Sequence, residues 1–244
     1  MLATPQANAQ SHSVMRYVAL ATDYDGTLAC EGRVDQRTSD SLLRFVASGR
    51  KLVMVTGRQL DDLQTVFPHL ELFSRVVAEN GALLYDPKSQ SQRILAEPFN
   101  SAFVDELRRR GVPLSTGKAI VATSRPHEKT VFDVIRERAL DFHVVFNKAS
   151  VMVLPSGVDK GTGLTSAMAE LGLSLHNTIG IGDAENDQAF LSLCGFSAAV
   201  ANALALLKKR VDLVTRGARG TGVVELIEQV LKDELGLSIR VSGC

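Results

Sequence analysis

Short apolar runs alternate with amphipathic stretches over the first third of the chain. Three runs are mostly apolar, as strands buried on both faces of a sheet are. They cover residues 17–22, 51–55 and 75–78. Residues 35–48 and 59–66 carry apolar side chains at helical spacing, and Gly49 and Pro68 follow them as helix-ending residues. Strands alternating with helices in this way predict a parallel sheet with helices on its faces.

The pattern changes after Asn80-Gly81, which is a strong turn signal. Apolar runs on both sides of a polar turn at residues 86–92 predict a hairpin. Helices are then predicted at 101–110 and 129–140, and strands at 119–123, 143–147 and 151–154. We interpret residues 85–154 as a small α+β unit inserted into the larger fold.

The strand–helix alternation resumes after this insert. Strands are predicted at residues 178–182, 197–200 and 212–214, and helices at 160–171, 187–194, 203–210 and 223–232. The predicted fold is therefore α/β, with a Rossmann-like parallel sheet core formed by residues 16–84 and 155–244. The first fifteen residues are small and polar, and we expect a flexible tail there.

The composition of the chain limits the kinds of binding partner and the cellular location that we expect. The chain has 244 residues, 27 basic and 27 acidic, so its net charge is zero. This balance gives no reason to expect nucleic-acid or membrane binding, and no apolar run is long enough to span a bilayer. The three cysteines, Cys30, Cys194 and Cys244, are scattered and odd in number, which favours a reducing, cytoplasmic location. The sequence leaves the oligomeric state open.

Polar side chains gather where three of the predicted strands end. Asp23 and Asp25 follow the first strand, Thr56 and Gly57 the second, and a third group follows strand 178–182. That group comprises Asp183, Asn186 and Asp187, and Lys160 begins the helix that precedes the strand. Because parallel strands bring their carboxyl ends to one edge of a sheet, we expect all these side chains to meet in one crevice.

This set of groups fits phosphoryl transfer. Carboxylate oxygens suit Mg²⁺, and a carboxylate can also be the nucleophile that takes up the phosphoryl group. A second acid can protonate the leaving oxygen, while a hydroxyl and an ammonium hold the phosphoryl oxygens. The sequence therefore predicts a Mg²⁺-dependent site for a phosphorylated compound.

Four short motifs in this order resemble those of the haloacid dehalogenase-like hydrolases. The first is Asp23-Tyr24-Asp25-Gly26-Thr27, the second Thr56-Gly57-Arg58, and the third Lys160. The fourth is Gly182-Asp183 with Asn186-Asp187. The position of the insert is similar to that in the class IIB capped phosphatases, so the resemblance implies that the insert is a cap domain. Four motifs in register are far more specific than one.

The resemblance also implies a role for each residue. Asp23 is expected to be the nucleophile, and Asp25 the general acid and base, with its backbone carbonyl on Mg²⁺. Thr56, Gly57, Lys160 and Asn186 are expected to bind the phosphoryl group. Asp183 and Asp187 are expected to complete the metal site together with Asp23 and Asp25. The implied substrate is a small phosphorylated metabolite, either a sugar phosphate or a phosphoglycolate-like acid, which is hydrolysed through an aspartyl-phosphate.

Simpler explanations exist for each motif alone. Thr56-Gly57 is also typical of a turn, Lys160 of a solvated first helical turn, and Asp183 of a helix N-cap. Two other functions stay open: a phosphomutase of the same fold, and a non-enzymatic phospho-receiver domain, which also gathers acids at a sheet edge. Release of free phosphate separates the first from a phosphatase, and turnover excludes the second.

Further charged residues are weaker candidates for contact with the substrate. Arg125, His127 and Lys148 lie in predicted loops of the insert, and Arg216 and Arg219 lie in a glycine-rich loop near the end of the chain. We favour the simpler explanation that all five are exposed loop residues. Arg58 is interpreted as an exposed residue at a helix start.

Overall fold

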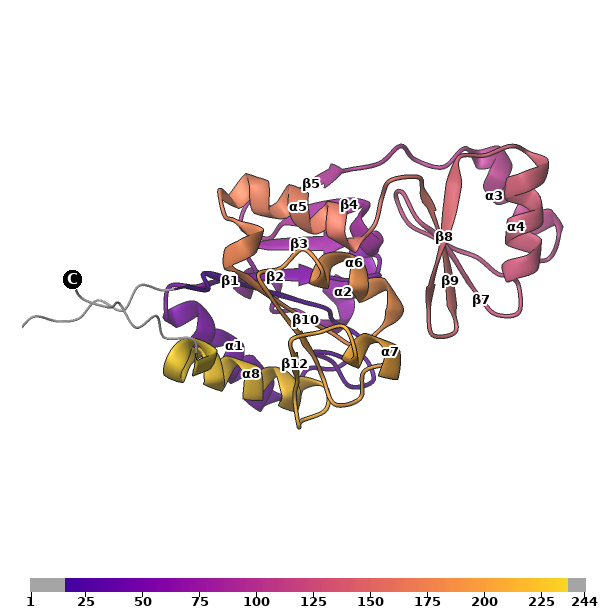
Figure 1. Ribbon diagram of the computed structural model, residues 1–244. Helices are drawn as coiled ribbons and strands as arrows, with labels where there is room; N and C mark the ends of the chain where they lie inside the picture. Colours follow the sequence, from indigo (N-terminus) through magenta and orange to yellow (C-terminus); the bar gives the residue numbers. More distant parts are fainter. Residues whose placement is uncertain (1–15, 237–244) are drawn as a thin grey trace, which may run out of the picture.

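The computed structural model describes residues 16–236, so the predicted tail at 1–15 and Cys244 lie outside the described residues. Within that range the strands form one sheet of eight and one sheet of four. Figure 1 shows the larger sheet with its flanking helices as one body, and the smaller sheet beside it with α3 and α4. The α/β architecture predicted from the sequence is confirmed.

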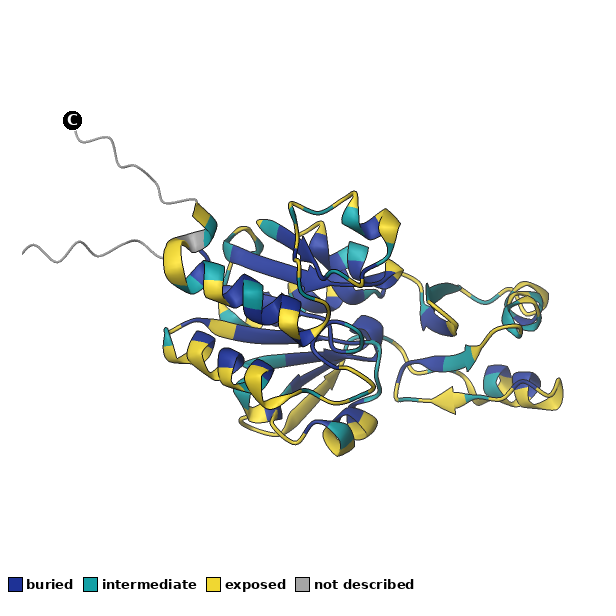
Figure 2. Cartoon of the chain, turned by 90° about the horizontal axis from the view of Figure 1, so that it is seen from below, coloured by how far each residue is buried: buried dark blue, intermediate teal, exposed yellow. Residues whose placement is uncertain are grey.

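The large sheet has the strand order β12-β11-β10-β1-β2-β3-β4-β5. Its first six strands pair in parallel. They are β12 (Leu213–Val214), β11 (Phe196–Ala199), β10 (Thr178–Gly182), β1 (Ala19–Thr22), β2 (Lys51–Val55) and β3 (Arg75–Ala78). Every residue of β1 and β10 is buried, as their continuous hydrophobicity predicts. Figure 2 shows this buried layer running through the sheet.

Helices cover both faces of this sheet. The helices α1 (Gln36–Ala47) and α8 (Gly220–Asp233) pack against each other on one face, and α5 (Lys160–Leu171) and α6 (Gln188–Leu191) lie on the other (Figure 1). Asp35 is the N-cap of α1, where its side chain accepts a hydrogen bond from the backbone N–H of Thr38. Two shorter helices, α2 (Leu60–Val66) and α7 (Ala205–Lys208), complete the core.

The predicted hairpin belongs to the large sheet. β4 (Leu83–Asp86) pairs antiparallel with β3, and β5 (Ser91–Ile94) pairs antiparallel with β4. The sequence analysis began the insert at residue 85 and so assigned β5 to it, which is wrong. The 3₁₀ turn Glu79–Gly81 reverses the chain within the sheet, and Leu83 and Leu84 are buried against the core. A hairpin's own pattern does not reveal which sheet it will join.

The inserted unit lies at residues 101–155, and we call it the cap unit. It consists of α3 (Ser101–Arg109), β6 (Ser115–Thr116), β7 (Val121–Ser124), α4 (Glu128–Glu137), β8 (Phe142–Asn147) and β9 (Ser150–Pro155). Its sheet is antiparallel, in the order β6-β7-β9-β8, and α3 and α4 contact each other. Phe103, Val131 and Val153 are central to an apolar cluster of its own.

A buried carboxylate fastens the cap unit to the core. Glu79, directly after β3, accepts backbone hydrogen bonds from Lys118 (2.9 Å) and Ala119 (2.8 Å). The Cα of Gly117 lies close to the same carboxylate, since a Cβ there would be 2.6 Å from its oxygen. Further along the cap unit, the tip between β8 and β9 reaches the core near Glu185.

Candidate active site

The predicted site residues come from neighbouring strands. β10, β1 and β2 lie side by side, so the loops carrying Asp183, Asp23 and Thr56 leave the sheet at one edge. The loop after β1 passes so close to Asp183 that a Cβ at Gly26 would lie 2.4 Å from its Oδ2. Gly26 also has a φ of +85°, so both its space and its backbone conformation favour glycine.

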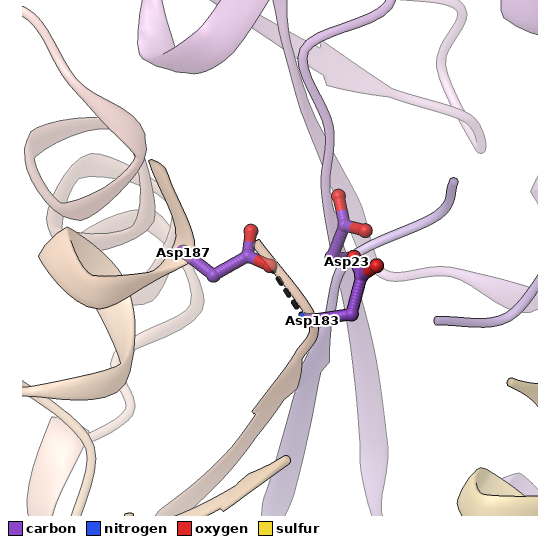
Figure 3. A group of neighbouring side chains, drawn as sticks. All are labelled: Asp23, Asp183 and Asp187. Carbon is purple, nitrogen blue, oxygen red and sulfur yellow. Dashed lines mark hydrogen bonds between the residues drawn. The ribbon is translucent and has the colours of Figure 1, made fainter. Parts of the chain in front are cut away.

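Three carboxylates form a buried cluster at this edge. Oxygen atoms of Asp23, Asp183 and Asp187 all lie within 4.8 Å of one another. Figure 3 shows the three side chains converging from β1 and from the loop after β10. Asp183 and Asp187 are fully buried, and Asp23 is nearly so. Three like charges in so small a volume repel one another unless cations compensate them.

Lys160 supplies one compensating charge from the first turn of α5. Its ammonium is fully buried and donates to Asp23 Oδ1 at 2.6 Å and to Asp187 Oδ1 at 2.7 Å. Asp159 caps the helix in front of it through a capping box with Thr162. The simpler explanation of Lys160 as a solvated helix-start residue is therefore wrong.

Asp187 also organises the loop that holds Asp183. Its second oxygen, Oδ2, accepts the backbone N–H groups of Asp183 (2.7 Å) and Ala184 (2.9 Å). Asp187 thus closes the turn before the short 3₁₀ helix Glu185–Asp187. The simpler explanation that gave the capping role to Asp183 is wrong, and the carboxylate of Asp183 is left to face the site.

Burial and charge shift the pKa values of these groups. Burial, together with the neighbouring Asp187 carboxylate, raises the pKa of Asp23 to about 8, although Lys160 acts in the opposite direction. Burial also raises the pKa of Asp183. Burial alone would lower the pKa of Lys160, but Asp187 and Asp23 outweigh it and raise that pKa. The three carboxylates of the cluster therefore carry more negative charge than the ammonium of Lys160 neutralises. A further positive charge would be favourable there.

Thr56 and Asn186 lie beside the cluster and have other partners. Thr56 is buried, and its hydroxyl accepts the backbone N–H of Arg58 at 3.1 Å. Asn186 donates its amide to Oδ1 of Asn80 at 2.8 Å. Among the described residues, Oδ1 of Asn186 and Nδ2 of Asn80 are buried without a hydrogen-bond partner. Such polar atoms at a sheet edge suit a polar ligand.

Asn80 is a site residue that the sequence analysis missed. Its dipeptide with Gly81 was interpreted only as a turn signal. In the structure it follows β3 at the same edge, and its backbone N–H donates to the carbonyl of Thr56. Its position directly after a buried parallel strand was the signal that could have identified it.

The side chain of Asp25 lies apart from the carboxylate cluster. Both of its oxygens accept hydrogen bonds from Arg58, Oδ2 from Nε at 2.6 Å and Oδ1 from Nη2 at 2.8 Å. Arg58, interpreted from the sequence as an exposed residue, therefore contacts the acid of the first motif directly. The ring of Tyr24 is fully buried below this loop.

Of the weaker candidates, two lie at the site. Lys148, at the tip between β8 and β9, donates to Asp183 Oδ2 at 2.7 Å. Arg219 lines a cavity of about 500 Å³ that Asp25, Arg58 and Lys148 also line. Arg125 instead pairs with Glu128, the first residue of α4, and lies over the ring of Phe146, within the cap unit. His127 precedes α4, and Arg216 lies outside the lining of this cavity.

The donor set fits a hard divalent cation. Asp23, Asp183 and Asp187 offer carboxylate oxygens within reach of one point, and oxygen is the ligand atom that Mg²⁺ and Ca²⁺ take. The excess of negative charge in the cluster supports the same conclusion. The three carboxylates could thus hold a cation of this kind.

The chain belongs to the haloacid dehalogenase-like hydrolases. The model of this family matches residues 20–110 and 115–227, which include all four motifs. The resemblance drawn from the motifs is thereby confirmed.

Named relatives cover nearly the whole chain. It is 26% identical over 233 residues to "Phosphoglycolate phosphatase 2" of Saccharolobus solfataricus, covering 92% of this chain and 97% of that protein. It is 31% identical over 222 residues to a phosphoglycolate phosphatase of Natronomonas pharaonis, covering 86% and 96%. A solved subclass IIB sugar phosphatase, 18% identical, matches with a TM-score of 0.71 over 86% of this chain and 98% of its own. That last likeness concerns the fold.

One further finding bears on membranes. Of the helices within residues 16–236, none combines the length and the apolar character that crossing a bilayer requires.

Proposed function

We propose that this protein is a phosphatase that hydrolyses the phosphomonoester of a small metabolite through an aspartyl-phosphate on Asp23, with Mg²⁺ as its cofactor. The observation that carries the proposal is the buried cluster of Asp23, Asp183 and Asp187, bridged by Lys160. Membership of a hydrolase family and relatives named phosphoglycolate phosphatases support it.

In the first half of the reaction, a carboxylate oxygen of Asp23 attacks phosphorus and the bond to the ester oxygen breaks. Lys160 holds Asp23 Oδ1 at 2.6 Å, which fixes the direction of the attacking carboxylate. Asp25 gives the leaving oxygen its proton. Thr56, the backbone N–H groups around Gly57, and Asn186 bind the phosphoryl oxygens.

In the second half, water attacks the phosphorus of the aspartyl-phosphate. Asp25 takes a proton from this water, which restores the acid and frees both phosphate and Asp23. Mg²⁺ would be held by Asp23, Asp183 and Asp187 with the backbone carbonyl of Asp25, and would neutralise charge on the phosphoryl group. The cap unit excludes bulk water from above the site.

The cavity next to the cluster supports a small, charged substrate. It measures about 500 Å³, which suits a small leaving group, and Arg58, Lys148 and Arg219 line it. Asp25 and Glu31 also line the cavity, so the three cations leave a small excess of positive charge. This excess favours an anionic or strongly polar metabolite, such as a phosphoglycolate-like acid or a sugar phosphate.

Release of free phosphate from a panel of phosphorylated metabolites tests the proposal. We expect turnover with Mg²⁺, its loss in EDTA and its recovery when Mg²⁺ is restored. Ca²⁺ should inhibit, because it takes more ligands at longer distances. Full turnover in EDTA would show that the reaction does not require a metal ion. Transfer of phosphate to a second hydroxyl of a bound sugar, without release, would favour the phosphomutase. A phosphorylated protein that never turns over would favour the receiver.

A further inference from the structure

Arg58 holds the side chain that we propose as the general acid. Its Nε and Nη2 donate to the two oxygens of Asp25 at 2.6 and 2.8 Å, and its Nη1 donates to Asp62 at 2.5 Å. The guanidinium also lies 5.5 Å above the ring of Tyr24, whose hydroxyl is tied to the carbonyl of Gly32. Two carboxylates and an aromatic face thus fix the guanidinium in place.

This pairing places Asp25 in a resting position. A general acid needs one carboxyl oxygen directed at the leaving oxygen of the ester. Here both oxygens of Asp25 are engaged by N–H donors of Arg58 in a two-point ion pair, which is among the stronger contacts between side chains. Proton transfer to a leaving group therefore requires that this pair separate.

The cavity beside the Asp25–Arg58 pair indicates which group can separate the two side chains. Asp25 and Arg58 form part of the same wall, so a leaving group that fills the cavity meets the guanidinium directly. A carboxylate has the planar shape and charge that the guanidinium fork binds best. An incoming carboxylate can therefore replace Asp25 on Arg58, which leaves the charge around the guanidinium unchanged.

We propose that Arg58 is a specificity-determining residue, which exchanges the carboxylate of Asp25 for an anionic group on the substrate and so releases Asp25 to act on the leaving oxygen. The proposal rests on the phosphatase function proposed above. It explains how an enzyme of this kind selects anionic leaving groups at the proton-transfer step as well as in binding. A neutral leaving group does not compete for Arg58, so Asp25 stays in its resting position.

The other two cations of the cavity have different positions. Lys148 donates to Asp183, which belongs to the carboxylate cluster. Arg219 lies in the loop before α8, and its backbone N–H donates to Asn202. Neither has a contact with Asp25 among those of the described chain, so neither links substrate binding to the release of that acid. Substitutions of Lys148 and Arg219 are matched controls for Arg58, because each substitution removes one positive charge from the same cavity.

The first experiment compares two esters of equal length, 2-phosphoglycolate and ethyl phosphate, which differ in one carboxylate. We expect the ratio of their kcat/KM values to be about a hundred or more in the unaltered enzyme, and to fall at least tenfold in Arg58→Met. Lys148→Met and Arg219→Met should keep the ratio within about threefold, and so should Asp62→Asn, which removes the second partner of Arg58. An equal loss for both esters in Arg58→Met, or a collapse of the ratio in Lys148→Met, would overturn the proposal.

The second experiment measures binding alone. Asp25→Asn removes the internal competitor for Arg58, so this variant should bind 2-phosphoglycolate several-fold more tightly than the unaltered enzyme and bind ethyl phosphate with little change. Adding Arg58→Met to it should abolish the gain. Unchanged or weaker binding of 2-phosphoglycolate in Asp25→Asn would contradict the exchange. Because no turnover is needed, this arm still decides the role of Arg58 if the enzyme releases no phosphate and the proposed function fails.

Discussion

The ammonium of Lys148 lies 2.7 Å from Oδ2 of Asp183 and joins the cap unit to the carboxylate cluster of the core. The carboxylate is fully buried, whereas the lysine side chain is 50% exposed. A cation carried by the cap unit therefore occupies one of the oxygens that we propose for the metal. The lysine and a metal ion compete for the same negative charge.

Replacing Lys148 by Met should tighten the binding of Mg²⁺. A half-exposed ion pair contributes about 1 kcal/mol, so its removal should lower the Kd for Mg²⁺ by about fivefold. Calorimetric titration of the phosphate-free protein measures this affinity. Lys129→Met is the matched control, because that lysine also lies in the cap unit but pairs with Asp133 on α4. Weaker Mg²⁺ binding in Lys148→Met would instead mean that the lysine assists the metal.

Asp23→Asn should lower kcat for p-nitrophenyl phosphate by at least about a thousandfold, because an amide is a poor nucleophile. The fold should persist, since the change relieves repulsion from Asp187 and Asp183. Phosphate release and thermal unfolding of the same preparation measure the two effects. Activity near that of the unaltered enzyme, in protein checked by mass spectrometry for deamidation, would exclude Asp23 as the nucleophile.

Glu106 should stabilise the cap unit in a way that depends on pH. Hydrogen bonds from Arg109 and Arg110 lower the pKa of Glu106 from 4.5 to about 2. Since the folded pKa lies below the unfolded one, the stabilisation is complete above about pH 4.5 and is lost as the pH falls through about 2. Glu106→Gln should lower the Tm at pH 7, and this difference should shrink steadily below pH 4.5. Asp105→Asn, one position earlier on α3, should show little effect because its pair with Arg108 is exposed.

Glu79→Gln should loosen the attachment of the cap unit. The substitution keeps one acceptor but turns an N–H donor toward a backbone N–H, so at least one of the bonds to Lys118 and Ala119 is lost. A charge-assisted hydrogen bond contributes about 2 kcal/mol, and amide exchange at residues 117–119 should accelerate accordingly. Glu97→Gln, an exposed carboxylate on the segment before α3, is the control. Unchanged exchange in Glu79→Gln would show that apolar contacts suffice to hold the loop.

Much of the core was predictable because its signals are local. Buried parallel strands are continuous apolar runs, and their carboxyl ends share an edge of the sheet. The meeting of Asp23, Asp183 and Thr56 at one edge therefore followed from the parallel arrangement, without knowledge of the strand order. The location of Lys160 in the site was predictable for a different reason. A cation at the start of a helix is poorly placed against the helix dipole, so a negatively charged partner is expected near it.

Other features of the structure were not predictable, because they depend on long side chains and on contacts between segments far apart in the sequence. Arg58 has a long side chain, and nothing in its neighbours along the chain reveals that it turns back to Asp25 and is not solvated. Lys148 meets Asp183 only because the cap unit folds over the core, a contact between residues 35 positions apart. β6 was missed because Ser115–Thr116 is short, polar and exposed, and shows no alternation.

Among the contacts that hold the cap unit to the core, those at Glu79 and Lys148 differ in character. At Glu79 a buried carboxylate grips two backbone N–H groups, whereas at Asp183 the contact is one long, half-exposed side chain. Rocking about Glu79 would lift the tip at residues 147–150 most and leave 117–119 almost stationary. Substrate would then enter and product leave on the Lys148 side, where the cavity lies.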